Sequence, residues 1–249
     1  NIGAGYSLTW WKDRHNKHHG ASNVLEQDPD IDNLPVFAWD ERDLDRLVAL
    51  NQPKASLGSI PYQAWYFLPF LTTLHAIWAL QSIRFLRILP SYKNRHVRQH
   101  LKAELITLTL HYVWLIYLMF KTPLPFITGP LFFLLAEMVG GFCLGIVVFF
   151  NHYPQQHFSA KDKLTFLEMQ VLSTRNIAPG FFLDWFTGGI SYQIEHHLFP
   201  TLGRNYLPLV RDRVQALCEK HGLPYAEETL ISGTFGTMRY LDSVSKKIM

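Results

Sequence analysis

The chain has 249 residues, of which 48% are hydrophobic and 14% aromatic, enough apolar material for one large domain or two small ones. This composition excludes a disordered chain, and a net charge of +3 is too weak to indicate nucleic acid as a partner. The two cysteines, Cys143 and Cys218, form neither a disulfide framework nor a CxxC metal motif, which favours a reducing compartment. The sequence begins at Asn1 without a signal peptide, so we expect it to be part of a longer protein.

Three long apolar runs predict helices that enter a membrane: residues 62–83, 105–120 and 129–150. Each is close to the length that spans a bilayer, and a helix satisfies every backbone N–H and C=O within the segment. The first run is less regular, because it contains Pro69 and Gln81 and several aromatic side chains typical of a membrane interface.

The basic segment between the first two runs, residues 84–102, predicts their orientation. It holds six Lys and Arg residues and neither Asp nor Glu, so the positive-inside rule places it in the cytosol. The second and third runs then form a transmembrane hairpin, with residues 122–128 on the far side and everything after Phe150 in the cytosol. The six basic residues are Arg84, Arg87, Lys93, Arg95, Arg98 and Lys102.

Two shorter elements are also predicted. Residues 28–32, with the sequence Asp-Pro-Asp-Ile-Asp, predict a turn. Near the C-terminus, Pro208 suits the first turn of a helix that Gly222 would end. This helix would be amphipathic, with one apolar face made of Val210, Val214, Leu217 and Cys218.

The first histidine cluster is His15-x-x-His18-His19. On a helix, imidazoles at positions i, i+3 and i+4 project from one face within a turn of each other. Imidazole nitrogen binds Fe, Zn, Cu and Ni, so the spacing predicts a metal site without choosing the metal. A solvated basic patch is the alternative, because Lys12 and Lys17 lie beside the cluster.

The second cluster, residues 193–197, repeats this spacing with Gln in place of the first His. His196 and His197 are adjacent, and Gln193 stands three residues before His196. An amide oxygen can bind a metal weakly or hold a metal-bound water, so Gln193 is a weaker candidate ligand. A pair of surface or helix-capping histidines is the alternative, and the repeated spacing counts against it.

Asn151 and His152 directly follow the third apolar run. If that helix leaves the membrane on the cytosolic side, His152 lies at the depth where both clusters can meet, although a histidine at a helix end is often only structural. One site reached by all these histidines requires them to share one face of the membrane. Residues 62–83 should therefore lie in the interface, or dip in and return, instead of crossing.

The remaining histidines are expected to have no chemical role. His75 and His111 lie within apolar runs and are predicted to be satisfied core or interfacial groups. Four others stand among polar and charged residues and are predicted to be solvated: His96, His100, His157 and His221. Six candidate ligands are more than one ordinary metal ion needs and too few for two, so further ligands are expected upstream.

Two of these segments resemble a known family. Residues 10–19 (Trp-Trp-Lys-Asp-Arg-His-Asn-Lys-His-His) and 193–200 (Gln-Ile-Glu-His-His-Leu-Phe-Pro) resemble the second and third histidine boxes of front-end fatty acid desaturases. That family includes delta-5, delta-6 and delta-8 acyl desaturases and related sphingolipid desaturases, and the Gln that opens the third box marks this branch. Further matches run along nearly the whole chain, at residues 26–32, 151–152, 174–176, 184–189 and 218–223.

The resemblance implies an all-α membrane protein, with a transmembrane helical hairpin, interfacial helices and cytosolic helical histidine-box regions that form a di-iron site. It implies O2 as co-substrate and two electrons delivered through cytochrome b5 and its reductase, so that a long acyl chain loses two hydrogens and gains a cis double bond. The implied location is the endoplasmic reticulum membrane, with the active site facing the cytosol.

The resemblance also implies roles for individual residues. The implied iron ligands are His15, His18, His19, His196 and His197, with His152 as a further ligand and Asn151 and Gln193 as weaker ones. Aromatic residues near the boxes would line an acyl tunnel or anchor the protein in the interface. These are Trp10, Trp11, Trp185 and Tyr192.

The family's first histidine box, its first transmembrane hairpin and the N-terminal cytochrome b5 domain of many members are absent from this sequence. We therefore expect residues 1–249 to be a partial desaturase domain that is inactive by itself. A sphingolipid delta-8 desaturase and a di-iron lipid hydroxylase remain open, because they use a similar histidine set. Two further interpretations also stay open: a histidine-rich metal transporter, whose ligands should lie inside the spans, and a catalytically silent membrane relative.

Overall fold

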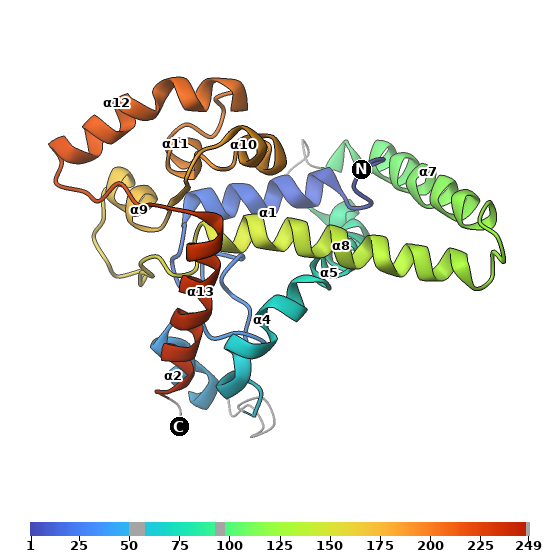
Figure 1. Cartoon of the computed structure of the whole chain (residues 1–249), viewed down its shortest axis with the longest axis horizontal. Coiled ribbons are helices and arrows are strands. Elements are labelled where there is room, and N and C mark those ends of the chain that lie inside the picture. The colour runs from blue at the N-terminus through green and yellow to red at the C-terminus, as the bar shows by residue number, and fades with distance from the viewer. Residues whose placement is uncertain (50–57, 93–97, 248–249) are drawn as a thin grey trace. The chain divides into compact units, whose positions relative to one another are not determined.

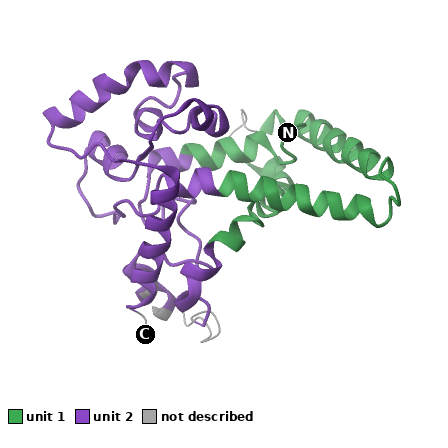
Figure 2. Ribbon diagram, in the orientation of Figure 1, with its two compact units in different colours: residues 1–16, 68–145 green, residues 17–67, 146–249 purple. Residues whose placement is uncertain are grey.

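The computed structural model describes residues 1–49, 58–92 and 98–247. The chain divides into two compact units: unit 1 comprises Asn1–Asn16 and Leu68–Gly145, and unit 2 comprises Lys17–Phe67 and Ile146–Met249 (Figure 2). Helices make up nearly all the regular structure of the described residues (Figure 1), which confirms the predicted helical class. Lys93, Arg95 and His96, three residues of the predicted basic segment, lie outside the described residues.

Unit 1 contains helix α7, Leu101–Phe120, and most of helix α8, Thr128–Phe150. In the described part of the chain, these are the two helices long and apolar enough to cross a membrane. Only 17% of the apolar window of each is buried inside the protein, so both offer apolar surface that suits lipid. They correspond to the second and third predicted runs, and the short connection between them supports the predicted hairpin.

The first predicted run does not form one long helix. A 3-10 turn, Ile60–Tyr62, leads into α4, Gln63–Leu71, and α5, Leu74–Ile88, follows after a break at Thr72 and Thr73. Both threonine hydroxyls donate hydrogen bonds to carbonyls three residues earlier, which satisfies backbone acceptors where the helix ends. Neither helix has spanning length, which supports the expectation that this run does not cross as a single span.

Helix α5 extends beyond the predicted boundary of the run. It continues to Ile88 and is followed by a 3-10 turn, Leu89–Ser91, so the prediction that a loop begins at Arg84 is wrong. The reason is that Arg and Lys are good helix formers, and their charge does not end a helix that is already propagating.

The N-terminal segment of unit 1 is held by polar side chains of the apolar helices. His75 on α5 lies 2.7 Å from the Ala4 carbonyl through Nε2 and 2.7 Å from Glu137 on α8 through Nδ1. His111 on α7 lies 2.6 Å from the Ile2 carbonyl through Nδ1. Gly5 has a φ of +70°, and a Cβ there would lie 2.6 Å from Nε2 of His111, so no larger residue fits. His75 and His111 are therefore satisfied structural groups, as predicted.

Unit 2 contains the shorter helices and the only paired strands of the described residues. The strands β1, Asn176–Ile177, and β2, Glu227–Glu228, are parallel, with Asn176 opposite Glu227. The helices and the 3-10 turn that lie wholly in unit 2 and are not yet introduced are α2 (Glu41–Ala49), α9 (Phe166–Leu172), α10 (Phe181–Thr187), α11 (Gln193–Leu198), η3 (Arg204–Tyr206), α12 (Leu207–Lys220) and α13 (Leu230–Ser245).

The predicted amphipathic helix is α12. It begins one residue before Pro208 and ends before Gly222, whose φ of +65° suits glycine. Its apolar face packs into a core cluster with α9 and α11, formed by Val171, Ile194, Val214 and Cys218 with Val210 and other partly buried residues around them. This cluster fixes α9 and α11 against each other, and both carry side chains of the candidate site.

The end of α8 is fastened to α13 by Arg175. The buried guanidinium donates to the Phe150 carbonyl at 2.9 Å and to the Gly233 carbonyl at 3.0 Å, and it lies 4.2 Å from the centre of the Phe150 ring. Burial lowers the pKa of Arg175 to about 10, so it remains charged at neutral pH. Since His152 follows Phe150 by two residues, this contact helps to fix where His152 lies.

Candidate metal centre

The first histidine cluster lies on a helix, as predicted. Helix α1, Leu8–Gly20, carries His15, His18 and His19. His18 and His19 are adjacent, so their side chains leave the helix about 100° apart and reach different neighbours. The same holds for His196 and His197 on α11. The two adjacent pairs therefore divide between two groups of imidazoles instead of forming one cluster.

The first group consists of His18, His152 and His197, all of them buried. One ring nitrogen of each lies within 4.8 Å of the corresponding atoms of the other two, close enough for a single metal ion between them. The ring centres are 4.5 Å apart for His18 and His152, 5.0 Å for His18 and His197, and 4.7 Å for His152 and His197. Residues 18, 152 and 197 thus converge from three separate segments of unit 2.

Each imidazole of this group has an oxygen acceptor beside Nδ1. The acceptor is a carboxylate oxygen of Asp28 for His18, at 2.8 Å, and the backbone carbonyl of Ser173 for His152, at 3.1 Å. For His197 it is the side-chain oxygen of Gln170, at 2.7 Å. An acceptor at Nδ1 places the proton there and leaves the lone pair on Nε2, which is the arrangement that histidine ligands of metals adopt.

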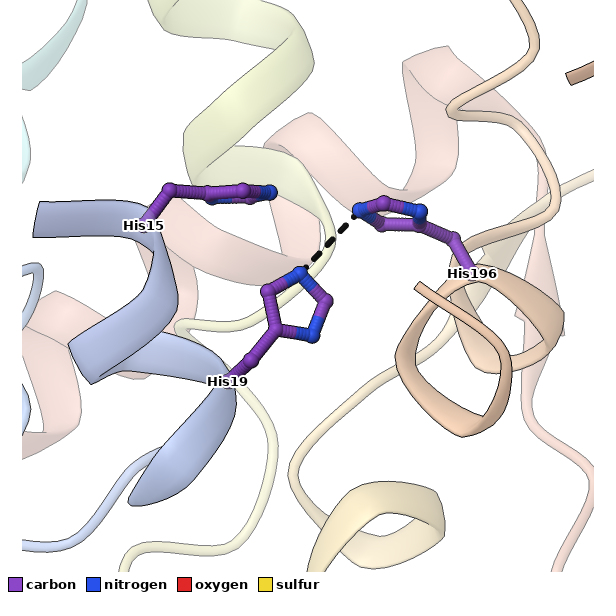
Figure 3. Close-up of side chains that lie close together, drawn as sticks. All are labelled: His15, His19 and His196. Atoms are coloured by element: carbon purple, nitrogen blue, oxygen red, sulfur yellow. Dashed lines mark hydrogen bonds between the residues drawn. The ribbon is translucent and has the colours of Figure 1, made fainter. Parts of the chain in front are cut away.

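The second group is formed by His19 and His196, whose Nε2 atoms lie 3.1 Å apart (Figure 3). His15 stands one turn before His19 on α1, so its side chain leaves the helix on the same side. The His19 ring also stacks on the ring of His197, with 4.2 Å between the ring centres. This stacking brings the second group next to the first.

The protonation state of the centre suits a metal ion. Nε2 of His197 is buried and has no hydrogen-bond partner among the described residues, so an ion would satisfy an otherwise costly polar atom. Burial lowers the pKa of His196 to about 4 and that of His197 well below the ordinary 6.5. Both therefore stay neutral at pH 7, the form that binds metals. A donor set of imidazoles fits iron among other transition metals.

The two weaker candidates differ in their surroundings. The amide nitrogen of Gln193 lies 2.9 Å from Nε2 of His152, and its oxygen is buried without a hydrogen-bond partner among the described residues. Gln193 thus reaches the first group. Asn151 donates instead to the carbonyls of Val147 at 3.2 Å and Ile190 at 3.4 Å, so its amide holds the end of α8. Its amide oxygen is also buried and has no hydrogen-bond partner among the described residues.

The groups that hold the histidines were not predicted from the sequence. Asn23 is fully buried, and its amide nitrogen donates to the carbonyls of His152 and Ser173, at 3.0 and 3.3 Å. Its backbone N–H donates to the same Asp28 oxygen that His18 contacts. The aspartates of residues 28–32 could have been recognised as partners of a nearby histidine. Gln170 offered no such signal, because it stands among ordinary helix-forming residues.

The four aromatic residues predicted to line a tunnel lie in different surroundings. Trp10 is buried against Trp78 in unit 1, and Trp11 stacks on His15 with 4.5 Å between the ring centres. Trp185 is 74% exposed, and it lines an open hollow of about 340 Å³ together with Tyr192, which is buried and immediately precedes Gln193. Their role in binding an acyl chain stays a prediction.

One of the histidines predicted to be solvated is buried. His157 is 7% exposed and stacks on the ring of Tyr240, so the prediction that it is solvated is wrong. Polar neighbours in sequence suggested solvent, but the chain folds back over this residue. His100 and His221 are exposed, as predicted.

The fold and the site describe a helical protein with two membrane-length apolar helices and a cluster of buried histidines. The sequence model of the family described as "Fatty acid desaturase" matches residues 2–229. This chain belongs to the fatty acid desaturase family. Family membership and the two apolar helices together indicate a membrane protein.

Curated relatives agree with this membership. The chain is 42% identical over 241 residues to the "Delta(8)-fatty-acid desaturase" of Euglena gracilis, covering 95% of this chain and 56% of the relative. It is 35% identical over 253 residues to the "Delta(6)-fatty-acid desaturase fat-3" of Caenorhabditis elegans, covering 100% of this chain and 56% of the relative. It is also 35% identical over 235 residues to the "Delta(5) fatty acid desaturase fat-4" of the same organism, covering 94% of this chain and 52% of the relative. The chain spans about half the length of these relatives.

Proposed function

We propose that this chain forms most of the iron-binding part of a front-end fatty acid desaturase, which inserts a cis double bond into a long-chain unsaturated acyl group. The observation that carries the proposal is the buried group of His18, His152 and His197, each with an oxygen acceptor at Nδ1 and with ligand atoms within 4.8 Å of one another. The names of the relatives, which are delta-8, delta-6 and delta-5 desaturases, support the same class of reaction.

Two metal positions follow from the two groups of histidines. We assign His18, His152 and His197 to one ion, with Gln193 as a weaker ligand, and His15, His19 and His196 to the other. Two iron ions held there would supply the activation of O2 that attack on an unactivated methylene requires. Since three imidazoles do not complete a five- or six-coordinate shell, further ligands would come from water, Gln193 or residues outside this chain.

Groups of the protein hold three of these ligands in a fixed orientation. Asp28, Gln170 and the Ser173 carbonyl each fix one imidazole through Nδ1, which keeps Nε2 directed at the metal position. Removing two hydrogens from the acyl chain and reducing O2 to two waters takes two further electrons and two protons. We assign their delivery to cytochrome b5 and its reductase, at the cytosolic face of the endoplasmic reticulum membrane.

The other interpretations predict different products or ligands. A di-iron lipid hydroxylase would use the same histidines but would leave a hydroxyl group in the product, and a sphingolipid delta-8 desaturase would act on a ceramide-type chain. A metal transporter would need ligands within its spans, yet both nitrogens of His75 and Nδ1 of His111 already contact protein acceptors.

The proposal is tested by expressing the full-length protein in yeast, feeding defined unsaturated fatty acids, and locating new double bonds by gas chromatography with mass spectrometry. His18→Ala and His197→Ala should each abolish iron binding and lower product at least about 100-fold, since even outer partners of a metal ligand cost about 10–100-fold. Membrane insertion should be retained in both variants.

His221→Ala is the matched control, because His221 is exposed and follows the last residue of α12. Its iron content and product should equal those of the wild type. An iron-loaded wild-type protein that forms no new double bond on any supplied acyl chain would overturn the desaturase proposal, and a hydroxylated product would replace it with the hydroxylase.

A further inference from the structure

Gln170 links the two histidine clusters through one buried side chain. It lies on α9, and its side chain is fully buried. Its amide nitrogen donates to the backbone carbonyl of His19 at 2.9 Å, and its amide oxygen lies 2.7 Å from Nδ1 of His197. These contacts join residues that are 151 and 27 positions away in the sequence. The same amide therefore holds the main chain of one cluster and an imidazole of the other.

The contact with His19 determines which way the amide faces. A backbone carbonyl only accepts hydrogen bonds, so the NH2 group of Gln170 must point at His19 and the oxygen must point at His197. An amide oxygen also only accepts, so Nδ1 of His197 must carry a proton. The neutral ring then has its lone pair on Nε2, the buried atom that has no hydrogen-bond partner among the described residues.

The position of Gln170 is itself fixed by the fold. Helix α9 begins with a capping box in which Thr165 and Glu168 bond each other's backbone. The next residue after Gln170, Val171, is buried in the core cluster with Ile194 of α11 and Val214 of α12. Because α9 is anchored at its start and along its apolar face, the Gln170 side chain has little freedom to leave the histidines.

We propose that Gln170 is a positioning residue of the metal centre. It sets the tautomer of His197, directs Nε2 of that ring at the metal position, and fixes the main chain of His19 beside it. This inference rests on the proposed function, because it takes His197 as a ligand. The same geometry would also let Gln170 tune the electron density that His197 gives to a metal ion.

Two substitutions separate positioning from packing. Gln170→Met keeps the length and apolar stem of the side chain but removes both hydrogen bonds. Gln170→Glu keeps an oxygen acceptor for His197 but replaces the donor to His19. A packing role predicts that Met is tolerated and the buried carboxylate of Glu is harmful. A positioning role predicts instead that Gln170→Glu retains the metal better than Gln170→Met.

The test uses the full-length protein purified from membranes in detergent and reconstituted with Fe2+ alone. Iron per protein, the rate of iron transfer to a ferrous chelator and the reduction potential of the bound iron are measured, with thermal unfolding of the metal-free protein as a check on folding. Gln170→Met should release iron about 10–100-fold faster than the wild type, the range found for other outer partners of metal ligands. Gln170→Glu should release iron more slowly than Gln170→Met and lower the reduction potential, because a carboxylate makes His197 a stronger donor.

Gln156→Met is the matched control, because Gln156 is an exposed residue whose side chain undergoes the same chemical change. It should leave all three readouts unchanged. Wild-type iron release in a folded Gln170→Met variant would overturn the proposal. If that variant does not fold, an unchanged reduction potential in Gln170→Glu would overturn it. A wild-type protein that binds no iron would instead contradict the proposed function, so the two failures are distinct.

Discussion

The two nitrogens of each imidazole have separate tasks at this centre. In His18, His152 and His197, Nδ1 contacts an oxygen of the protein, which leaves Nε2 available for a metal ion. The sequence predicted that these histidines meet at one site, but the His-x-x-His-His spacing did not predict that His18 joins His152 and His197 while His19 meets His196. It did not predict Asp28, Ser173 and Gln170, because those contacts exist only after distant segments pack.

The buried His157 should make the folding stability of the protein depend on pH. Its imidazole is buried beside Tyr240, and burial lowers its pKa to about 4, with a further decrease from the charge of Arg42 that Asp40 opposes. The unfolded chain therefore takes up a proton at a higher pH than the folded protein. Stability contributed by neutral His157 is present above the ordinary pKa of 6.5 and is lost as pH falls towards 4.

Lowering the pH from 7.5 to 5 should cost about 2 kcal/mol at this residue alone. His157→Gln should remove that dependence, so its unfolding midpoint should fall less between the two pH values than that of the wild type, as measured by thermal or denaturant unfolding. The exposed His221→Gln variant should follow the wild-type profile. If the stability of His157→Gln and of the wild type changed equally with pH, the pKa of His157 would not be lowered by folding.

At the scale of elements, the end of α8 depends on a close approach to α13. A Cβ at Gly233 would lie 2.0 Å from the Phe150 ring and 2.8 Å from the Arg175 guanidinium. Phe150 cannot easily move, because it is buried and Arg175 lies over its ring. Gly233→Ala should therefore destabilise the protein by about 1–3 kcal/mol, measured by thermal unfolding, and it should weaken iron retention by displacing His152.

Gly236 on the same helix provides the control. A Cβ there would meet its nearest atom, a carboxylate oxygen of Glu228, at 3.7 Å, which is ordinary contact. Gly236→Ala should raise helix stability by up to about 1 kcal/mol and leave iron retention unchanged. Equal effects of the two substitutions would mean that the approach of α13 to Phe150 does not position His152.

Element boundaries were predicted well where side-chain pattern sets them and poorly where packing does. Pro208 and Gly222 marked the limits of α12 closely, because proline and glycine act through their own backbone geometry. The break at Thr72 and Thr73 was not predicted, since both residues also occur within apolar helices. The division of His18 from His19 between two groups follows from the helical rotation per residue, but only the folded chain shows which neighbours each one meets.

At the scale of the whole molecule, the proposed topology places the connection between α7 and α8 in the lumen and the residues after α8 in the cytosol. Phe126 in the connection is 81% exposed, and Lys161 after α8 is also exposed. In a background without Cys143 and Cys218, Lys161→Cys should react with a membrane-impermeant maleimide in sealed microsomes. Phe126→Cys should react only after the vesicles are permeabilised.

Labelling of both positions in intact vesicles would show that the hairpin does not cross the membrane. The reverse pattern would keep the hairpin but overturn the cytosolic orientation. The sequence predicted the two apolar helices from length and hydropathy, and the family from the histidine motifs. It cannot predict the position of the new double bond, which depends on how far an acyl chain extends past the metal centre.

The proposed assignment of adjacent histidines to different metal positions has a consequence for the order in which the ions bind. His196 and His197 share one peptide bond on α11, and His18 and His19 share one on α1. An ion bound by His18 and His197 would restrict both helices and thereby order His19 and His196 for a second ion. Ordering the two helices then lowers the affinity for the first ion but not for the second. Iron should therefore bind to this centre with positive cooperativity.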